Sequence, residues 1–117
     1  MKTIFVIALL AALPSVALAH ATLDRAMPPV GSSQTAAPRE VVLSFTEDLE
    51  PAFSTIEVRN ESGAVVSSGK ARVDVKQHTQ LRVPLKSLPP GTYKVIWRVL
   101  SVDTHRTTGD FTFKVGP

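Results

Sequence analysis

The sequence predicts an all-β domain, an antiparallel Greek-key β-sandwich of immunoglobulin-like type. Three observations indicate it: short stretches of alternating apolar and polar residues, turn signals about every ten residues, and no convincing helical period over three turns. The Cys…Trp…Cys pattern of true immunoglobulin domains is absent because the chain has no cysteine. The prediction therefore concerns architecture alone.

The N-terminal residues 1–19 are predicted to be a secretory signal peptide. Lys2 supplies a positive charge, residues 4–13 form a short apolar core, and Ala17-Leu18-Ala19 matches the small-x-small cleavage pattern. The apolar core is shorter than the roughly 20 residues of a membrane span. We expect cleavage after Ala19 and export of a single domain, residues 20–117, that is not inserted in the membrane; the alternative is an uncleaved N-terminal anchor.

The mature chain offers about seven short strands, separated by loops rich in Gly, Pro, Ser and Asn. The first is a short edge strand that ends at the Pro-Pro-x-Gly turn of residues 28–31, and residues 32–38 and 47–51 are predicted loops. The other candidate strands are residues 41–46, 54–59, 64–66, 72–76, 80–85, 92–100 and 110–115. The strand over 92–100 is the clearest, because every second residue from Tyr93 to Val99 is apolar and either aromatic or β-branched.

Charge and composition exclude several classes of function. The formal net charge is +3, or +2 once Lys2 is removed, and the Lys and Arg residues are scattered rather than grouped in a basic stripe. A nucleic-acid partner is therefore not expected. Without cysteine there is no disulfide, thiolate metal site or cysteine nucleophile, so a metal would be held by imidazole, carboxylate, amine or thioether groups.

Asp103 and His105 are candidate metal ligands because residues at i and i+2 of an extended chain point to the same side. Cleavage after Ala19 would make His20 the first residue, with a free α-amine that titrates near pH 8. Its amine and ring Nδ1 could chelate one ion, and His105 and Asp103 would complete a set of three nitrogens and one oxygen. Such a tetragonal set suits Cu(II), although Zn(II) would accept the same ligands.

Each of these residues also has an alternative interpretation. His20 could stand at the cleavage site by chance, and residues 103–105 could be a loop that caps its own backbone. A hydrolytic site is excluded, because Ser101, Asp103 and His105 lie too close along one loop for a nucleophile–base–orienter arrangement.

Several short motifs stand out along the mature chain: His20-Ala21-Thr22-Leu23, Pro28-Pro29-Val30-Gly31, Leu43-Ser44-Phe45-Thr46-Glu47, the block from Gly91 to Val99, and Ser101, Asp103, His105, Gly109 and Phe111-Thr112-Phe113. Together they resemble the CopC family of periplasmic copper-binding proteins. The resemblance spans essentially the whole mature chain.

The resemblance implies a cupredoxin-like or immunoglobulin-like sandwich that binds Cu(II) without catalysis. The implied ligands are His20, Asp103 and His105. Glu47 would lie beside them or act as a weak axial group, unless it is only a solvated loop carboxylate. The implied role is a periplasmic carrier that sequesters copper or passes it to a CopD-type inner-membrane transporter.

Some members of the family have a second, Cu(I) site built from a methionine-rich loop and a histidine. The mature chain has only Met27, so no Cu(I) site is expected here. His78 lies in a polar stretch and is expected to be exposed.

Two other functional classes stay open. One is a copper-dependent oxidoreductase similar to lytic polysaccharide monooxygenases, which also use an N-terminal histidine. The other is a metal-free interaction module.

Overall fold

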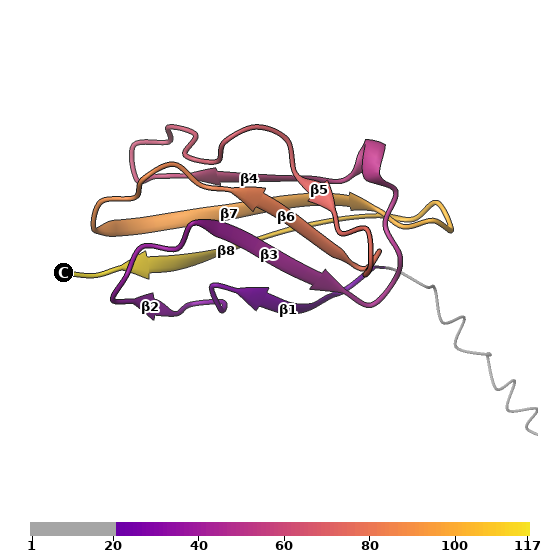
Figure 1. The fold of residues 1–117 in the computed structure, drawn as a ribbon, viewed down its shortest axis with the longest axis horizontal. Coiled ribbons are helices and arrows are strands. Elements are labelled where there is room, and N and C mark those ends of the chain that lie inside the picture. Colours follow the sequence, from indigo (N-terminus) through magenta and orange to yellow (C-terminus); the bar gives the residue numbers. More distant parts are fainter. Residues whose placement is uncertain (1–20) are drawn as a thin grey trace, which may run out of the picture.

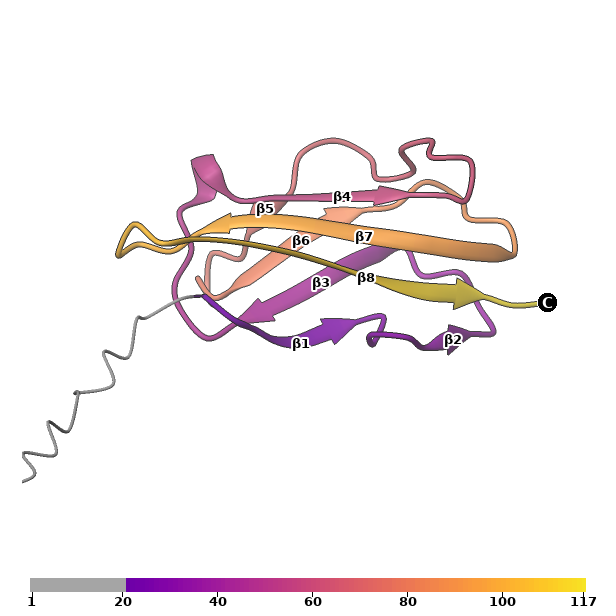
Figure 2. The same ribbon diagram turned by 180° about the vertical axis from the view of Figure 1, so that it is seen from behind.

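The computed structural model describes residues 21–117 as two stacked four-stranded sheets (Figure 1; Figure 2). Residues 1–20, which include the predicted signal peptide and His20, lie outside the described part. The strands are β1 (Leu23–Met27), β2 (Ser33–Gln34), β3 (Glu40–Phe45), β4 (Thr55–Arg59), β5 (Arg72–Val73), β6 (Gln80–Pro84), β7 (Gly91–Leu100) and β8 (Arg106–Val115), with the short 3-10 helix η1 (Pro51–Phe53) before β4. The predicted β-sandwich is confirmed.

The strand order is β1-β3-β6-β5 in one sheet and β2-β8-β7-β4 in the other. Several strands that follow each other in the chain, such as β3 and β4 or β6 and β7, belong to different sheets, so these connections cross between the two layers. All pairs are antiparallel except β2 with β8, which is parallel. The prediction of a plain loop over residues 32–38 was therefore wrong at β2, whose two polar residues carry no alternation that could mark a strand.

The hairpin of β7 and β8 is the longest feature of the molecule and runs along most of its length (Figure 1). Its pairing is continuous from Gly91 opposite Val115 to Leu100 opposite Arg106. The side chains that alternate toward the other sheet are all buried, as predicted: Tyr93, Val95, Trp97, Val99, Phe111, Phe113 and Val115. They meet the buried Val41, Leu43 and Phe45 of β3, and Phe45 packs edge-on against Trp97 at a centroid distance of 5.3 Å.

Gly109 lets Trp97 lie against the neighbouring strand. The two residues are paired across β7 and β8, and a Cβ atom placed on Gly109 would lie 2.2 Å from Cζ2 of the indole. No side chain fits at that distance, so the position requires glycine.

Three of the predicted strands differ clearly in extent. The strand predicted over residues 72–76 is limited to β5, Arg72–Val73. Residues 64–66 form only an isolated bridge, between Val65 and Arg59, rather than a strand. The last strand begins at Arg106 instead of Asp110, so that β7 and β8 are joined by the short turn of residues 101–105. Asp103 and His105 therefore lie at the tip of a long hairpin.

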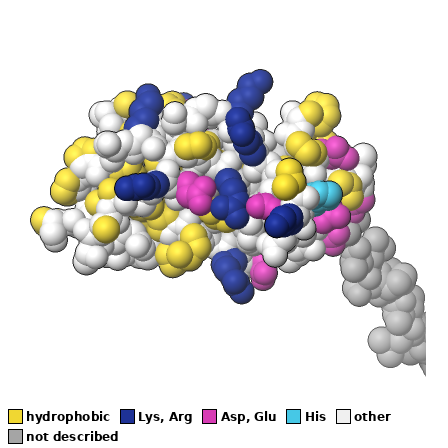
Figure 3. Space-filling view, viewed as in Figure 1, with side chains coloured by type: hydrophobic (Ala, Val, Ile, Leu, Met, Phe, Trp, Pro, Cys, Tyr) yellow, Lys and Arg dark blue, Asp and Glu magenta, His cyan; other side chains and the backbone are white. Residues whose placement is uncertain are grey.

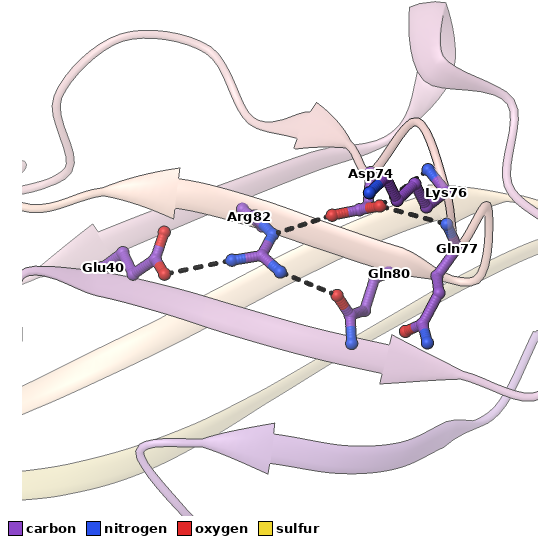
Figure 4. Close-up of polar contacts among 6 residues, drawn as sticks. All are labelled: Glu40, Asp74, Lys76, Gln77, Gln80 and Arg82. Carbon is purple, nitrogen blue, oxygen red and sulfur yellow. Dashed lines mark hydrogen bonds and ion pairs between the residues drawn. The ribbon is translucent and has the colours of Figure 1, made fainter.

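Arg82 on β6 forms hydrogen bonds and ion pairs with several side chains on the outer face of its sheet (Figure 4). Its guanidinium donates to Glu40 on β3 at 3.1 Å and to Gln80 at 3.0 Å, and its Nε lies 3.4 Å from Asp74. Asp74 in turn accepts the backbone N–H groups of Lys76 and Gln77 at 2.8 and 3.0 Å. This network shapes the turn between β5 and β6.

The same turn supports the loop that follows β3. The carbonyl oxygen of His78 accepts a hydrogen bond of 2.9 Å from the backbone N–H of Leu49. His78 itself is exposed, as predicted. Within residues 21–117, no helix has the length and apolar character needed to cross a membrane.

Candidate metal centre

Three segments meet at one end of the sandwich, which we call the site end: the chain start at residues 21–22, the loop of residues 46–50 after β3, and the turn of residues 101–105. Figure 1 and Figure 2 both place the start of β1, the end of β3 and the turn between β7 and β8 at this end, opposite the C-terminus. Acidic side chains and a histidine gather there on the surface seen in Figure 3, whereas the Lys and Arg side chains are spread along the molecule.

The turn of residues 101–105 is tightly hydrogen-bonded. The N–H of Ser101 donates to the carbonyl of His105 at 3.0 Å, and the N–H of Thr104 donates to the carbonyl of Ser101 at 2.9 Å. Thr104 has a φ of 73°, a left-handed conformation that is uncommon for a β-branched residue. The sequence-based argument assumed an extended chain here, and that assumption was wrong.

Asp103 and His105 nevertheless converge, because the turn brings them together. Oδ2 of Asp103 lies 3.3 Å from Nδ1 of His105, and each side chain is 37% exposed. Nδ1 itself is buried, so the exposed surface of the imidazole lies on the rest of the ring. The pair offers an imidazole and a carboxylate at the surface, both of which are ligands for Cu(II) and Zn(II).

Ser101 supports this pair from the interior of the fold. It is fully buried, its hydroxyl donates a short hydrogen bond to Oδ1 of Asp103, and its Oγ accepts the backbone N–H of His105 at 3.3 Å. The Ser101 hydroxyl is the main cause of the lowered pKa of Asp103, and His105 lowers it further. Sequence reasoning included Ser101 in the motif but assigned it no role; its position two residues before Asp103 was the available signal.

The order of these three side chains also bears on catalysis. The carboxylate of Asp103 lies between the Ser101 hydroxyl and the His105 ring. A nucleophilic triad needs the histidine between the serine and the acid, so the arrangement does not activate Ser101.

The loop after β3 lies directly beside the turn. Leu49 and Ser101 form a bridge, the N–H of Val102 donates to the carbonyl of Asp48 at 3.0 Å, and the N–H of Glu50 donates to the carbonyl of Leu100 at 2.8 Å. Glu47 is half-buried within this loop. Its predicted role next to the metal stays a prediction.

The chain start is hydrogen-bonded to the loop after β3 and to β8, the strand that follows the turn. The N–H of Thr22 donates to Oγ1 of Thr46 at 3.0 Å, and the N–H of Thr46 donates to the carbonyl of Thr22 at 2.9 Å. The Thr107 hydroxyl donates to the carbonyl of Ala21 at 2.7 Å. Ala21, which directly follows His20, is therefore bonded to the strand that begins right after His105.

The described residues supply only part of a metal site. Within residues 21–117, no group of three or more His, Cys, Asp or Glu side chains is arranged to hold an ion. Asp103 and His105 give two donors, and His20, the third predicted ligand, lies outside the described residues. Further donors would have to reach the pair from the chain that precedes Ala21 or from solvent.

Comparison of this chain with known proteins identifies the family to which it belongs. The model of the CopC domain matches residues 23–116. The chain belongs to the CopC family. Among curated relatives, protein YobA of Escherichia coli K12 is 41% identical over 98 residues, which cover 83% of this chain and 79% of YobA. The copper transport protein CutJ of Bacillus subtilis is 32% identical over 105 residues, which cover 89% of this chain but 19% of CutJ.

Solved structures agree with this assignment. CopC from Methylosinus trichosporium OB3b superposes with a TM-score of 0.79 at 33% identity, covering 84% of this chain and 95% of that one. PcoC of E. coli, described as a methionine-rich copper resistance protein, has a TM-score of 0.72 at 33% identity, covering 83% and 99%. The chain is thus a member of a family of copper resistance and transport proteins, as the resemblance of its motifs implied.

Proposed function

We propose that the mature chain is a periplasmic Cu(II)-binding protein that sequesters copper or transfers it within copper homeostasis. Copper is its cargo, held at one mononuclear site by the α-amine and ring of His20 together with Asp103 and His105. The observation that carries the proposal is the hydrogen bond from Thr107 to the carbonyl of Ala21. It fixes the residue after His20 next to the turn that bears the other two ligands.

The ligand set is chemically consistent with Cu(II). Amine and imidazole nitrogens with one carboxylate oxygen form a tetragonal N,N,N,O set, and Cu(II) has the highest affinity of the divalent first-row ions for such donors. The α-amine is available only after cleavage behind Ala19, so the proposal includes removal of residues 1–19. Export would place the protein in the periplasm.

Within this site Asp103 and His105 would bind the ion side by side, because Oδ2 of Asp103 and Nδ1 of His105 lie 3.3 Å apart. Two donors that each lie about 2 Å from one ion can be separated by this distance. Glu47, from the adjacent loop, would lie outside the three-residue set or act as a weak axial group.

A Cu(I) site is not part of the proposal. Cu(I) prefers several thioether ligands, and PcoC is a methionine-rich relative. This chain has two methionines, and only Met27 remains after cleavage. One exposed thioether cannot form such a site.

The copper would be passed to a CopD-type transporter of the inner membrane. CutJ supports a connection with transport, because a copper transport protein contains a segment similar to nearly all of this chain within a far longer sequence.

The proposal is tested by titrating Cu(II) into the mature chain and following absorption, EPR and thermal stability. One equivalent should bind and raise the melting temperature, because a ligand that binds only the folded state stabilises it. His105→Ala and Asp103→Ala should each weaken binding by about 100-fold or more, since loss of partners outside a ligand set already costs about 10- to 100-fold. His78→Ala, which removes an exposed imidazole on the turn between β5 and β6, is the matched control.

Two results would contradict the proposal. Equal weakening by His78→Ala and His105→Ala would contradict the proposed ligand set, which gives His78 no role, and no binding at all would favour a metal-free module. Copper-dependent oxygen consumption with a reductant would instead indicate an oxidoreductase. The carrier we propose consumes none.

A further inference from the structure

The first two described residues are held by hydroxyl groups from both sheets. Thr46, just beyond the end of β3, accepts the N–H of Thr22, and Thr107 on β8 donates to the carbonyl of Ala21. The regular pairing of β1 with β3 ends at Leu23 opposite Phe45. Beyond that pair, the chain is held by these two side-chain hydrogen bonds and by the backbone hydrogen bond from the N–H of Thr46 to the carbonyl of Thr22.

An unattached chain end would normally fray. Terminal residues are poorly ordered unless bonded to the rest of the fold. Here Ala21 is fully buried and belongs to the hydrophobic core, although it precedes the first strand. Burial and the Thr107 hydrogen bond together fix its position at the site end.

The attachment point is close to the metal-binding turn in sequence and in space. Thr107 is the second residue of β8 and follows His105 by two positions. Thr46 precedes Glu47, in the loop that bonds to residues 100–102. The two threonines thus connect the chain start to the segments that carry Asp103, His105 and Glu47.

We propose that Thr107, assisted by Thr46, is a positioning residue for copper binding. Thr107 touches no proposed donor atom; it holds residue 21 so that the amine and ring of His20 start beside Asp103 and His105. Pre-ordering a ligand in its bound position raises affinity because less conformational entropy is lost on binding. This inference rests on the proposed function, since it assigns Thr107 a role only if His20 is a ligand.

The test is a double-mutant cycle between Thr107 and the N-terminus. Thr107→Val, which removes the hydroxyl and keeps the shape, is made in the mature chain that begins at His20 and in a chain with one extra alanine before it. Cu(II) affinity is measured by competition with a chelator, and the ligand set by EPR. Thr108→Val, an exposed neighbour on β8, is the matched control, and Thr107→Ser, which keeps a hydroxyl, is the rescue variant.

Thr107→Val should weaken Cu(II) binding by about tenfold in the mature chain. This value is the lower end of the loss in metal affinity, about 10- to 100-fold, that follows removal of groups that orient ligands. It should change affinity less than about twofold in the extended chain, in which His20 no longer has the free α-amine of the proposed chelate. Thr108→Val should have no effect in either chain, and Thr107→Ser should restore most of the affinity.

A second readout needs no metal. In the copper-free protein, Thr107→Val should speed hydrogen exchange at the Thr22 amide without changing exchange at Val95 in the core. Thr46→Val removes the acceptor of that same amide and should give the same local effect. If Thr107→Val does not fold, Thr46→Val tests the same attachment of the chain start.

The outcomes separate this inference from the proposed function. If the mature and extended chains bind copper equally, the His20 chelate is absent and both proposals fail. If the mature chain binds more tightly but Thr107→Val changes nothing, only the positioning role fails. Equal weakening of both chains by Thr107→Val would also overturn it, because Thr107 would then act through the His105 turn.

Discussion

Asp103 lies between two neighbours in the turn at the site end: Oδ2 is 3.3 Å from Nδ1 of His105, and Oδ1 accepts the hydroxyl of Ser101. The turn therefore builds an oriented carboxylate–imidazole pair from local contacts alone. Because Ser101 is fully buried and bridged to Leu49, the base of the turn is anchored in the sandwich. The turn thus holds at the surface the two side chains that the proposed copper site requires.

Replacing Ser101 by alanine should disturb the pair without removing a proposed ligand. The pKa of Asp103 should rise toward its ordinary value, because the hydroxyl favours the ionised carboxylate. Affinity for Cu(II) should fall by about tenfold. An NMR pH titration of the Asp103 carboxyl carbon in the copper-free protein measures the first effect, and a competition titration measures the second.

Ser87→Ala, at an exposed serine between β6 and β7, is the control for Ser101→Ala. It should leave both quantities unchanged. An Asp103 titration that is the same in Ser101→Ala and in the parent would contradict the assigned role of Ser101.

Asp74 should contribute a pH-dependent part of the stability. Its pKa is lowered, chiefly by the backbone N–H groups of Lys76 and Gln77, with a smaller contribution from Arg82. A carboxyl with a lowered folded-state pKa stabilises the fold above its unfolded pKa of about 3.9 and loses this effect as the pH falls through the folded value. Asp74→Asn should therefore lower the free energy of unfolding at pH 7, and the difference from the parent should shrink in acid.

Urea unfolding at several pH values from 7 down to below 3 measures this difference. Asp110→Asn, at an exposed aspartate on β8, is the comparison. A difference between Asp74→Asn and the parent that stays constant over the whole range would show that the charge of Asp74 does not stabilise the fold.

Gly109→Ala should destabilise the sandwich strongly. The added methyl group would lie 2.2 Å from the indole of Trp97, so the ring or the strand must move. Overpacking of this kind costs about 1 to 3 kcal/mol. Denaturant unfolding followed by the fluorescence of Trp97, the single tryptophan, measures the loss.

Gly116→Ala is the matched substitution, because its Cβ would approach nothing closer than 3.9 Å. It should change the free energy of unfolding by less than about 0.5 kcal/mol. Equal effects of the two substitutions would mean that the packing of Trp97 on Gly109 is unimportant.

Much of the fold follows from the alternation of residue types. The pattern from Tyr93 to Val99, and that from Phe111 to Val115, predicts which side chains are buried, because the period of a strand is two. β2 could not be predicted, since Ser33 and Gln34 form a strand only by pairing with Lys114 and Val115. The early start of β8 was missed for a similar reason: its first residues are polar and pair with β7 through the backbone.

The candidate site was predictable in part. The spacing of Asp103 and His105 indicated that they converge, although the cause is a turn with a left-handed Thr104 rather than an extended chain. The roles of Ser101 and Thr107 depend on contacts that the order of residues does not reveal. Thr107 bonds to Ala21, which lies 86 positions away in the sequence.

Whether the free α-amine of His20 binds copper is tested most directly by comparing the mature chain with one that carries a single extra alanine. Cu(II) is titrated into both, with EPR to report the ligands. We predict that the mature chain binds one equivalent with a nitrogen-rich tetragonal spectrum and that the extended chain loses this site. Identical affinities and identical spectra would contradict the proposed site, even if copper binds elsewhere on the molecule.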